Sequence, residues 1–382
     1  MSDRGYMDRA LELAEIATGT TAPNPPVGAV IVRDGAILGE GFTQPIGGPH
    51  AEIQALADAT RRGHVPAGAT MYVTLEPCCH HGRTPPCSHA IVRAGIARVV
   101  MGVLDPYDKV QGRSVAELRA AGIEVELGVE AERAARVVLA FARAQRLELP
   151  EITAKAAVTL DGHIATASGE SQWITGEAAR ADGHLLRSAH DAVMVGIGTV
   201  LADDPRLTLR LADGARPGLT AATPPAPVVL DSQLRISAEA RLFATGRAVV
   251  VCAEDAPPRE LPGTVVRVPR GAGGHLDVVA ALRALVGMGH HRILVEGGGH
   301  VHRALLDARV VDTLQLYVAG KIVVGGRPWI AGPALTSLAD APQAFLRDVT
   351  RLGPDVRLTY ELTHGLDPNG VDRLVHQRPA GR

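Results

Sequence analysis

Short apolar runs alternate with segments of helical periodicity along most of the chain, which limits it to the α/β class of folds. Before residue 147, strand-like runs are separated by segments whose apolar residues recur at helical spacing. Asp34-Gly35, between two such runs, is a strong hairpin signal. Alternating strands and helices form a sheet with helices on both faces, a three-layer α/β/α unit. The sequence predicts helices over residues 6–17, 51–61, 88–94, 114–121 and 131–145, and strands over 27–33, 37–41, 70–75, 97–103 and 124–127.

This alternation is interrupted near Pro150 and then resumes. The chain has 382 residues, about two and a half times a typical ~150-residue domain, so two domains are expected. In the second part we predict strands over 152–160, 192–195, 228–231, 248–252, 264–268 and 292–295, and helices over 176–189, 275–286 and 300–308. Residues from 363 onward show no periodicity. The expected organisation is a first domain over 1–147, a second over 148–365 and a loosely ordered tail over 366–382.

Composition argues against several classes of function. A net charge of −2 gives no general basic surface for nucleic acid, and 3% aromatic residues leave few rings for stacking on bases. The N-terminal segment lacks the apolar core of a signal peptide, and the longest nearly apolar run, residues 192–202, is too short to span a bilayer. We therefore expect a cytoplasmic protein that contacts neither nucleic acid nor membrane.

A cluster of cysteines and histidines indicates a metal site, because so few cysteines in a long chain do not make a disulfide scaffold. His50 opens a predicted helix, and Cys78 and Cys87 follow a predicted strand. One imidazole and two thiolates can bind tetrahedral Zn²⁺ and leave the fourth position for a water molecule, whose pKa the metal lowers. Glu52 can lie beside the metal and carry protons to a leaving amine. His-x-Glu followed by Pro-Cys and a second Cys is typical of zinc-dependent cytidine and adenine deaminases.

Two other interpretations of this cluster stay open from the residues alone. In a closed structural site, His80 or His81 supplies a fourth ligand, although such a site does not need Glu52. In the other, Cys79 is the ligand in place of Cys78. The first cysteine of the pair, at the head of the loop, is the better placed of the two. Cys252, far from the cluster, is expected in the core.

The spacing of the cysteines narrows the range of possible substrates. Eight residues separate Cys78 from Cys87, whereas the deaminase pattern usually has two. This insert is rich in His and Arg, which can hold a phosphate. Upstream, Asn24 lies just before a strand, where it can read the edge of a heterocycle or simply form a turn between prolines.

In the second part, segments 155–162 and 171–175 combine a cation, a turn and a rare tryptophan. Segment 195–210 leads from a buried strand through a glycine-rich turn to two carboxylates and two arginines, and segment 293–300 leads through three glycines into a helix. Such glycines let main-chain N–H groups approach a phosphate at the helix N-terminus, although a tight turn alone also explains them.

The arginines of segment 195–210 suggest a phosphate site. We predict that Arg206, Thr208 and Arg210 share one face of a strand, so that two guanidinium groups converge on one phosphate. Arg206 can equally be a solvated surface residue. Asp203 or Asp204 can equally be a turn former.

Three segments of the first part together resemble the N-terminal half of the bifunctional riboflavin-biosynthesis deaminase/reductases: TAPNPPVGAVIV, GGPHAEIQAL and YVTLEPCCHHGRTPPC. The long insert ending in TPPC separates that family from nucleoside and tRNA deaminases. The resemblance implies deamination of a diaminohydroxypyrimidine that carries a phosphoribosylamino group. It assigns zinc to His50, Cys78 and Cys87, proton transfer to Glu52, and substrate contacts to Asn24, His80 and Arg83. The sequence departs from the family at Thr43, where histidine is frequent, and at Cys79, where serine is usual.

Four segments of the second part resemble, in order, the reductase half of the same family: KAAVTLDG, SQWIT, VGIGTVLADDPRLTLR and ILVEGGGHVHRALL. This half has a dihydrofolate-reductase-like fold in the family. The resemblance thus covers roughly residues 5–330. It implies NADPH as the hydride donor. It assigns the ribosyl-phosphate substrate to Ser171, Arg187, Leu207, Arg210 and Glu296, and NADPH to Ala157, Trp173, Thr199, Asp203, Gly298, Gly299, His300, Val301 and His302.

The resemblance implies a two-step enzyme with a cytidine-deaminase-like first domain and a dihydrofolate-reductase-like second domain. Zinc-dependent deamination of 2,5-diamino-6-(5-phosphoribosylamino)pyrimidin-4-one precedes NADPH-dependent reduction of the ribosyl group to ribityl. Lys155, Asp203 and Glu296 are proton-transfer candidates in the reduction by charge alone. We expect a small phosphorylated pyrimidine as substrate and a homo-oligomer as the assembly. The rivals are a nucleoside or tRNA deaminase fused to an unrelated cofactor-binding module, and a zinc-stapled binding protein without activity.

Overall fold

The computed structural model describes residues 2–80, 85–216 and 224–362. The chain divides into two compact units, one ending at Glu148 and the other beginning at Leu149. Each unit has its own main sheet and buried core. The expected tail over 366–382 lies outside the described residues.

The first unit contains a five-stranded sheet in the order β2-β1-β3-β4-β5. Its strands are β1 (Gly28–Arg33), β2 (Ala36–Phe42), β3 (Thr70–Leu75), β4 (Arg98–Val103) and β5 (Glu124–Leu127). β1 is antiparallel to β2 and β3, whereas β3, β4 and β5 are parallel. The hairpin predicted at Asp34-Gly35 is confirmed, with both residues at positive φ as a type I′ turn requires.

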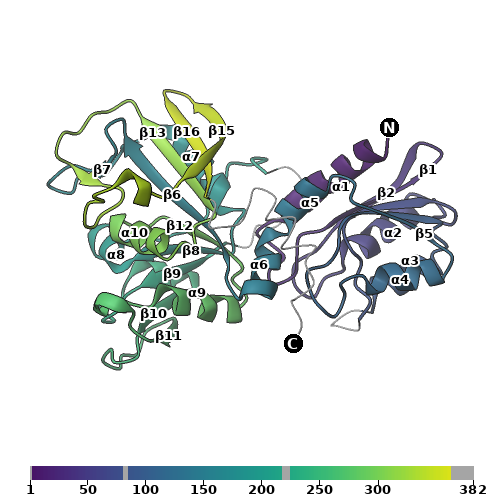
Figure 1. Cartoon of the computed structure of the whole chain (residues 1–382), viewed down its shortest axis with the longest axis horizontal. Coiled ribbons are helices and arrows are strands. Elements are labelled where there is room, and N and C mark those ends of the chain that lie inside the picture. Colours follow the sequence, from purple (N-terminus) through teal and green to yellow (C-terminus); the bar gives the residue numbers. More distant parts are fainter. Residues whose placement is uncertain (1, 81–84, 217–223, 363–382) are drawn as a thin grey trace. The chain divides into compact units, whose positions relative to one another are not determined.

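Helices cover both faces of this sheet, as predicted (Figure 1). α1 (Asp3–Ala17) and α5 (Ala131–Val137) pack together on one face, and α2 (Ala51–Arg61), α3 (Cys87–Arg93) and α4 (Arg113–Ala120) lie on the other. α6 (Leu139–Leu147) follows α5. The single helix predicted over 131–145 is therefore wrong. Val138 separates the two helices with φ −92° and ψ 6°, and neighbouring β-branched valines weaken a helix at this point.

Two glycines let α2 lie directly against β2. A Cβ at Gly39 would lie 2.3 Å from the main-chain oxygen of Ala55, and one at Gly41 would lie 2.5 Å from the main-chain nitrogen of Ala55. No larger residue fits at either position without moving the helix. Because His50 directly precedes α2, this packing also fixes where the helix N-terminus meets the sheet.

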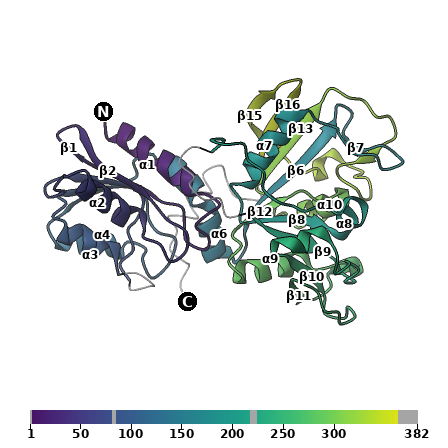
Figure 2. The same ribbon diagram turned by 180° about the vertical axis from the view of Figure 1, so that it is seen from behind.

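The second unit contains a nine-stranded sheet in the order β11-β10-β9-β8-β12-β6-β13-β16-β15 (Figure 2). The seven strands from β11 to β13 are parallel, and β16 and β15 extend one edge in antiparallel pairing. The strands are β6 (Glu151–Thr159), β8 (Ala192–Gly196), β9 (Ala226–Leu230), β10 (Val249–Ala253), β11 (Thr264–Val268), β12 (Arg292–Val295), β13 (Thr313–Ala319), β15 (Ala344–Leu352) and β16 (Asp355–Leu362). A separate small sheet pairs β7 (His163–Ala165) with β14 (Arg327–Pro328).

Helices also cover both faces of this larger sheet. α7 (Glu177–Arg187) and α8 (Ile197–Asp203) contribute apolar side chains to the core on one face, and α9 (Val278–Gly287) and α10 (Gly299–Asp307) to the core on the other. Cys252 is buried in the former core, as expected. No described helix is long and apolar enough to cross a membrane.

The predicted strand through Arg206, Thr208 and Arg210 is wrong. Residues 204–212 have no regular secondary structure, and Leu207 takes a φ of +51°, which an extended strand does not permit. A strand periodicity therefore does not bring Arg206 and Arg210 onto one face. β13, β15 and β16 are further strands that the sequence pattern does not predict.

Candidate active sites

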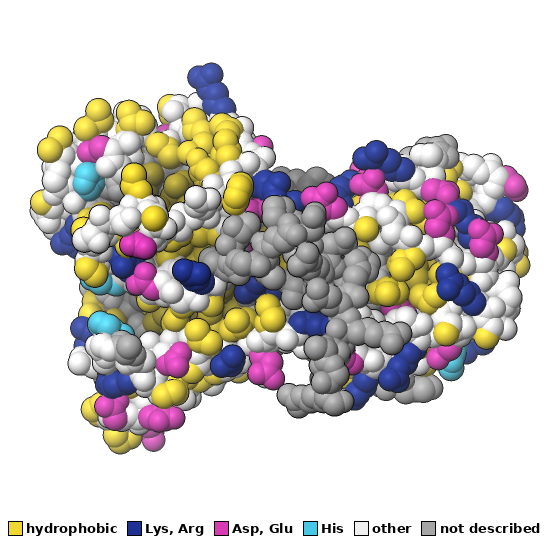
Figure 3. Space-filling view, in the orientation of Figure 1, with side chains coloured by type: hydrophobic (Ala, Val, Ile, Leu, Met, Phe, Trp, Pro, Cys, Tyr) yellow, Lys and Arg dark blue, Asp and Glu magenta, His cyan; other side chains and the backbone are white. Residues whose placement is uncertain are grey.

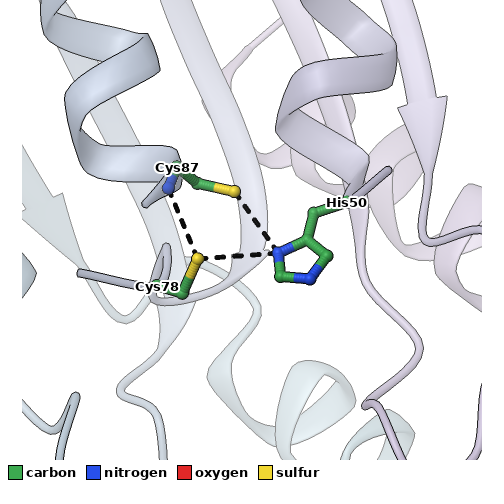
Figure 4. A group of neighbouring side chains, drawn as sticks. All are labelled: His50, Cys78 and Cys87. Carbon is green, nitrogen blue, oxygen red and sulfur yellow. Dashed lines mark hydrogen bonds between the residues drawn. The ribbon is translucent and has the colours of Figure 1, made fainter. Parts of the chain in front are cut away.

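Three potential metal ligands converge in the first unit. Nδ1 of His50 lies 3.5 Å from Sγ of Cys78 and 3.4 Å from Sγ of Cys87 (Figure 4). One donor atom from each residue lies within 4.8 Å of the other two, and no other donor joins this group among the described residues. The three residues expected to bind zinc are thus gathered at one point.

The donor set fits zinc in chemistry and in size. Tetrahedral coordination with Zn–N near 2.0–2.1 Å and Zn–S near 2.3 Å separates nitrogen from sulfur by about 3.6 Å. The two separations from the His50 nitrogen are close to this value. The three side chains leave one tetrahedral position open, as in a catalytic rather than a structural zinc site.

The local fold places each of these donors at the end of a regular element. His50 is the N-cap of α2. Cys78 lies just beyond the end of β3, and Cys87 is the first residue of α3. The main-chain N–H of Cys87 donates to Sγ of Cys78 at 3.3 Å, which is the arrangement that stabilises a thiolate. Hydrogen bonds from Cys87 and His50 hold the pKa of Cys78 well below its ordinary value despite its burial.

Glu52 lies in the first turn of α2 and is almost completely buried. Its burial and the negative charge of Cys78 raise its pKa to about 7. A carboxyl group that titrates near neutrality is suited to accept and return a proton. Glu52 is therefore placed beside the three donors without being one of them.

A cavity of about 420 Å³ opens onto His50, Glu52 and Cys78. Asn24 and His80, both expected to contact substrate, line the same cavity, and so does Thr43. The remaining lining residues are Pro23, Pro25, Val27, Ile46, Gly47, Gly48, Leu75, Glu76, Asp105, Tyr107, Phe141 and Gln145. This volume suits a small ligand with a heterocyclic ring.

Thr43 occupies the position where the resembled family often has histidine. Its hydroxyl forms a hydrogen bond within the protein. It accepts a hydrogen bond from the main-chain N–H of Val27 at 3.1 Å. Thr43 is also buried. Its hydroxyl therefore links the end of β2 to the start of β1, at the wall of the cavity.

Cys79 and His80 lie outside the ligand group. Sγ of Cys79 lies 3.8 Å from the main-chain oxygen of Lys109, and the ring of His80 stacks edge-on against Tyr107. Among the described residues this geometry favours Cys78 over Cys79 and gives no support to a closed site through His80. His81 and Arg83 lie outside the described residues.

Glu76 is a site residue that the sequence analysis missed. Its buried carboxylate accepts hydrogen bonds from the main-chain N–H groups of Asp105, Gly112 and Ser114 at 2.8–3.1 Å, and from the Ser114 hydroxyl at 2.9 Å. These bonds attach the start of α4 to the end of β3, next to the metal ligands.

In the second unit, the expected site residues gather at the carboxyl ends of three neighbouring parallel strands. β8, β12 and β6 are adjacent in the sheet. Gly196 is the last residue of β8, Glu296 follows the last residue of β12, and Ala157 lies in the last part of β6, beyond its pairing with β12. Ligands of open α/β sheets bind at this edge, where loops and helix N-termini converge. The positions expected to hold substrate and cofactor therefore share one edge.

Arg187 and Glu296 form a bidentate ion pair, with nitrogen-to-oxygen distances of 2.6 and 2.7 Å. Burial raises the pKa of Glu296, but the charge and hydrogen bonds of Arg187 outweigh it and lower the pKa to about 2. Arg187 also donates to the main-chain oxygen of Thr208 at 2.9 Å. It thereby attaches the segment that contains buried Leu207 and exposed Arg210 to α7.

The N-terminal turn of α10 packs closely against its surroundings. A Cβ at Gly298 would lie 4.0 Å from the Thr199 hydroxyl, and one at Gly299 would lie 2.8 Å from the main-chain nitrogen of Ala331. His302 is buried, and its Nδ1 lies 3.2 Å from the Trp329 oxygen. Thus Thr199 and the glycines are brought together, whereas the side chain of His302 is engaged in packing.

The other residues predicted to bind cofactor or substrate lie in the segment before α7, at the end of α8 and in the first turn of α10. Trp173 is 60% exposed and stacks on the guanidinium of Arg180 at 4.7 Å, in the segment before α7 that also contains Ser171. Asp203, the last residue of α8, is exposed. His300 is exposed and Val301 half-buried in the first turn of α10.

Family models match both units. Residues 1–103 match the cytidine and deoxycytidylate deaminase zinc-binding region, and residues 150–358 match the RibD C-terminal domain. The matches fall on the part of the chain that holds the three donors and on the part that holds the Arg187–Glu296 pair.

Relatives extend over nearly the whole chain. Riboflavin biosynthesis protein RibD of Escherichia coli K12 is 42% identical over 94% of this chain and 99% of its own length. A solved deaminase/reductase from Thermotoga maritima, described as acting on diaminohydroxyphosphoribosylaminopyrimidine and 5-amino-6-(5-phosphoribosylamino)uracil, has a TM-score of 0.84 at 35% identity over 94% of this chain and 99% of its own. Acinetobacter baumannii RibD has a TM-score of 0.83 at 35% identity over 95% and 99%.

Proposed function

The chain belongs to the RibD family of bifunctional riboflavin-biosynthesis enzymes, which carry a deaminase and a reductase on one polypeptide, and from this premise we propose how its residues perform the two reactions. The expected fold classes are confirmed, a cytidine-deaminase-like first domain and a dihydrofolate-reductase-like second domain. The substrate proposed for the first is 2,5-diamino-6-(5-phosphoribosylamino)pyrimidin-4-one. The substrate proposed for the second is the deaminated product.

In the deaminase, His50, Cys78 and Cys87 would hold the zinc ion of the family's zinc-binding region. Bound zinc would supply a Lewis acid that lowers the pKa of a coordinated water. Glu52 takes a proton from the attacking water and delivers it to the departing amine, so that ammonia leaves and the ring gains a carbonyl. Asn24 and His80 hold the pyrimidine and its ribosyl-phosphate group along the cavity.

In the reductase, the proposed hydride donor is NADPH, which would supply the hydride that converts the ribosyl group to an open ribityl chain. Thr199, Asp203, Ala157, Trp173 and the turn 298–302 would hold it, because the glycines of this turn place main-chain N–H groups at the start of α10. Ser171, Leu207, Arg210 and the Arg187–Glu296 pair would hold the ribosyl-phosphate. The ion pair keeps Glu296 ionised, which favours Lys155 as the proton donor over this carboxylate.

One observation carries this proposal: the cluster of His50, Cys78 and Cys87 opens into a cavity that also exposes Glu52. A purely structural zinc site does not need a buried carboxyl group beside an open coordination position. The long insert between the two cysteines argues against the nucleoside and tRNA deaminases.

The direct test supplies the phosphoribosylamino-pyrimidine and NADPH together. Ammonia release and loss of absorbance at the nicotinamide band are followed in the same sample. We expect one ammonia for each NADPH oxidised, with ammonia released first. Turnover of free cytidine, or ammonia without NADPH oxidation, would contradict the proposal.

A homo-oligomer is also proposed, through the β15 edge of the second unit. Figure 3 shows hydrophobic side chains gathered over β15 and β16. Phe345, Leu346 and Val349 of β15 are 47%, 52% and 56% exposed, and β15 is the last strand of the sheet. An exposed apolar edge strand is a site for pairing with another copy. Light scattering should show a dimer for the unchanged chain and a monomer for Leu346→Lys.

A further inference from the structure

His184 is a residue of α7 that lies outside the Arg187–Glu296 ion pair. It lies one helical turn before Arg187, so both side chains project from the same face of the helix. Nε2 of His184 lies 3.1 Å from Nη2 of Arg210. Nδ1 of His184 is buried and has no hydrogen-bond partner among the described residues.

The hydrogen bond fixes the form of the imidazole. A guanidinium can only donate, so Nε2 of His184 must accept and its proton must lie on Nδ1. A protonated His184 would instead place a hydrogen and a positive charge against Arg210. The contact therefore requires the neutral ring.

The surroundings of His184 favour this neutral form. Its burial, together with the nearby charges of Arg187 on α7 and Arg210 on the following segment, lowers its pKa to about 4, and Lys155 on β6 acts in the same direction. Glu296, just after β12, opposes them, but its charge is already matched by Arg187. The imidazole is therefore neutral at pH 7.

Arg187 and Arg210 consequently differ in whether a neighbouring group balances their positive charge. Arg187 is bound to a carboxylate, so the pair with Glu296 is neutral overall. Arg210 is held by a neutral imidazole and keeps its full positive charge, while its side chain remains exposed. A phosphate dianion is attracted to Arg210 more strongly than to the neutral pair.

We propose that His184 is a positioning residue of the reductase, which holds Arg210 as the anchor for the phosphate of the ribosyl substrate without neutralising it. This inference rests on the proposed function of the second domain. A carboxylate at position 184 would also orient Arg210, but it would cancel the charge that the phosphate needs.

The test compares His184→Leu, His184→Gln and Arg210→Met in the full chain. Reduction of the deaminated substrate is measured, and ribose 5-phosphate and ribose are titrated calorimetrically as probes. Leucine should raise KM and weaken ribose 5-phosphate about tenfold with little change in kcat, because one hydrogen bond to a charged group is lost. Glutamine supplies a neutral acceptor and should restore both values to within about twofold.

Two controls separate positioning from a structural effect. His184→Leu should have no further effect in the Arg210→Met background, because the interaction is already absent. His275→Leu, at an exposed position of the same unit, should leave all values unchanged. Unfolding temperatures of the variants show whether leucine disturbs the fold.

Failure of the proposed reduction and failure of the role of His184 give different results in these measurements. If the unchanged chain does not reduce the substrate, the proposed function fails, and the ribose 5-phosphate titration still decides the role of His184. If reduction occurs but leucine and glutamine behave alike, or if ribose 5-phosphate does not bind the unchanged chain, the role of His184 is overturned.

Discussion

The guanidinium of Arg187 meets the carboxylate of Glu296 through two parallel hydrogen bonds, at a point where both side chains are largely buried. This pair joins α7 to the residue that follows β12. The same arginine reaches the main chain at Thr208. Three segments that are distant in sequence are thereby fixed at one edge of the sheet.

Removing the charge of Glu296 should destabilise the second unit. Glu296→Gln leaves the Arg187 guanidinium buried without its counter-charge, at a cost of about 3 kcal/mol in the free energy of unfolding at pH 7. The folded pKa of about 2 lies below the ordinary value of 4.5, so the stabilisation is present above pH 4.5 and is lost as the pH falls toward 2. Urea unfolding at pH 7, 5, 4 and 3 should show the difference between the two proteins narrowing below pH 5. A difference independent of pH would contradict this account.

Glu52→Gln should abolish deamination and leave the rest of the enzyme intact. Glutamine fills the same space but cannot carry a proton, so ammonia release should fall by 10²–10⁴-fold, roughly the contribution of general acid–base catalysis. Zinc content, measured by atomic absorption, should not change. NADPH oxidation with pre-deaminated substrate serves as the internal control, because it depends on the other unit and should keep its rate. Unchanged ammonia release would exclude Glu52 from proton transfer.

Cys78→Ser and Cys79→Ser are a matched pair of variants that tests which of the two cysteines binds zinc. Serine at position 78 removes a thiolate within 3.5 Å of the His50 nitrogen, so bound zinc should fall well below one per chain. Serine at position 79 removes only a weak contact to the Lys109 oxygen, and zinc should stay at one per chain. The reverse result would transfer the ligand role to Cys79.

The first unit could be predicted from sequence almost element by element, because its strands and helices are short, regular and separated by glycine-containing turns. The helix over 131–145 failed because its apolar spacing continues across Val138, where the backbone turns. β15 and β16 were missed because their side chains are half-buried or exposed at a sheet edge, so burial imposes no simple alternation of apolar and polar residues.

The cluster of His50, Cys78 and Cys87 was predictable as a candidate zinc site because coordination chemistry demands particular residue types at particular spacings. The role of Glu76 was not, since its partners are main-chain groups of residues 105–114, which no sequence pattern reveals. The same holds for His184, whose partner Arg210 is 26 residues away along a segment without regular structure. The strand predicted for that segment failed because a periodicity of two says nothing about φ at Leu207.

The two glycines of β2 give a matched test of how the fold positions the metal site. A Cβ at Gly39 would meet the backbone of Ala55 and Ala59, in the middle and last part of α2. A Cβ at Gly41 would meet the main-chain nitrogen of Ala55 and the Cβ of Gln54, and also the main-chain oxygen of Ala51, in the first turn. Both should lower the free energy of unfolding by about 1–3 kcal/mol, because the added methyl group meets backbone atoms.

The two variants should differ in zinc binding. Gly41→Ala moves the turn that contains His50 and Glu52, so zinc should be lost at a lower chelator concentration than in Gly39→Ala. Chelator titration monitored by a zinc-sensitive dye measures this difference, and chemical unfolding of each variant provides the stability to which it is compared. Because the two substitutions add the same methyl group to the same strand, equal zinc retention would show that α2 shifts as a rigid body. Weaker retention in Gly41→Ala alone would show that the close packing of Gly41 against residues 51–55 positions His50 relative to the sheet.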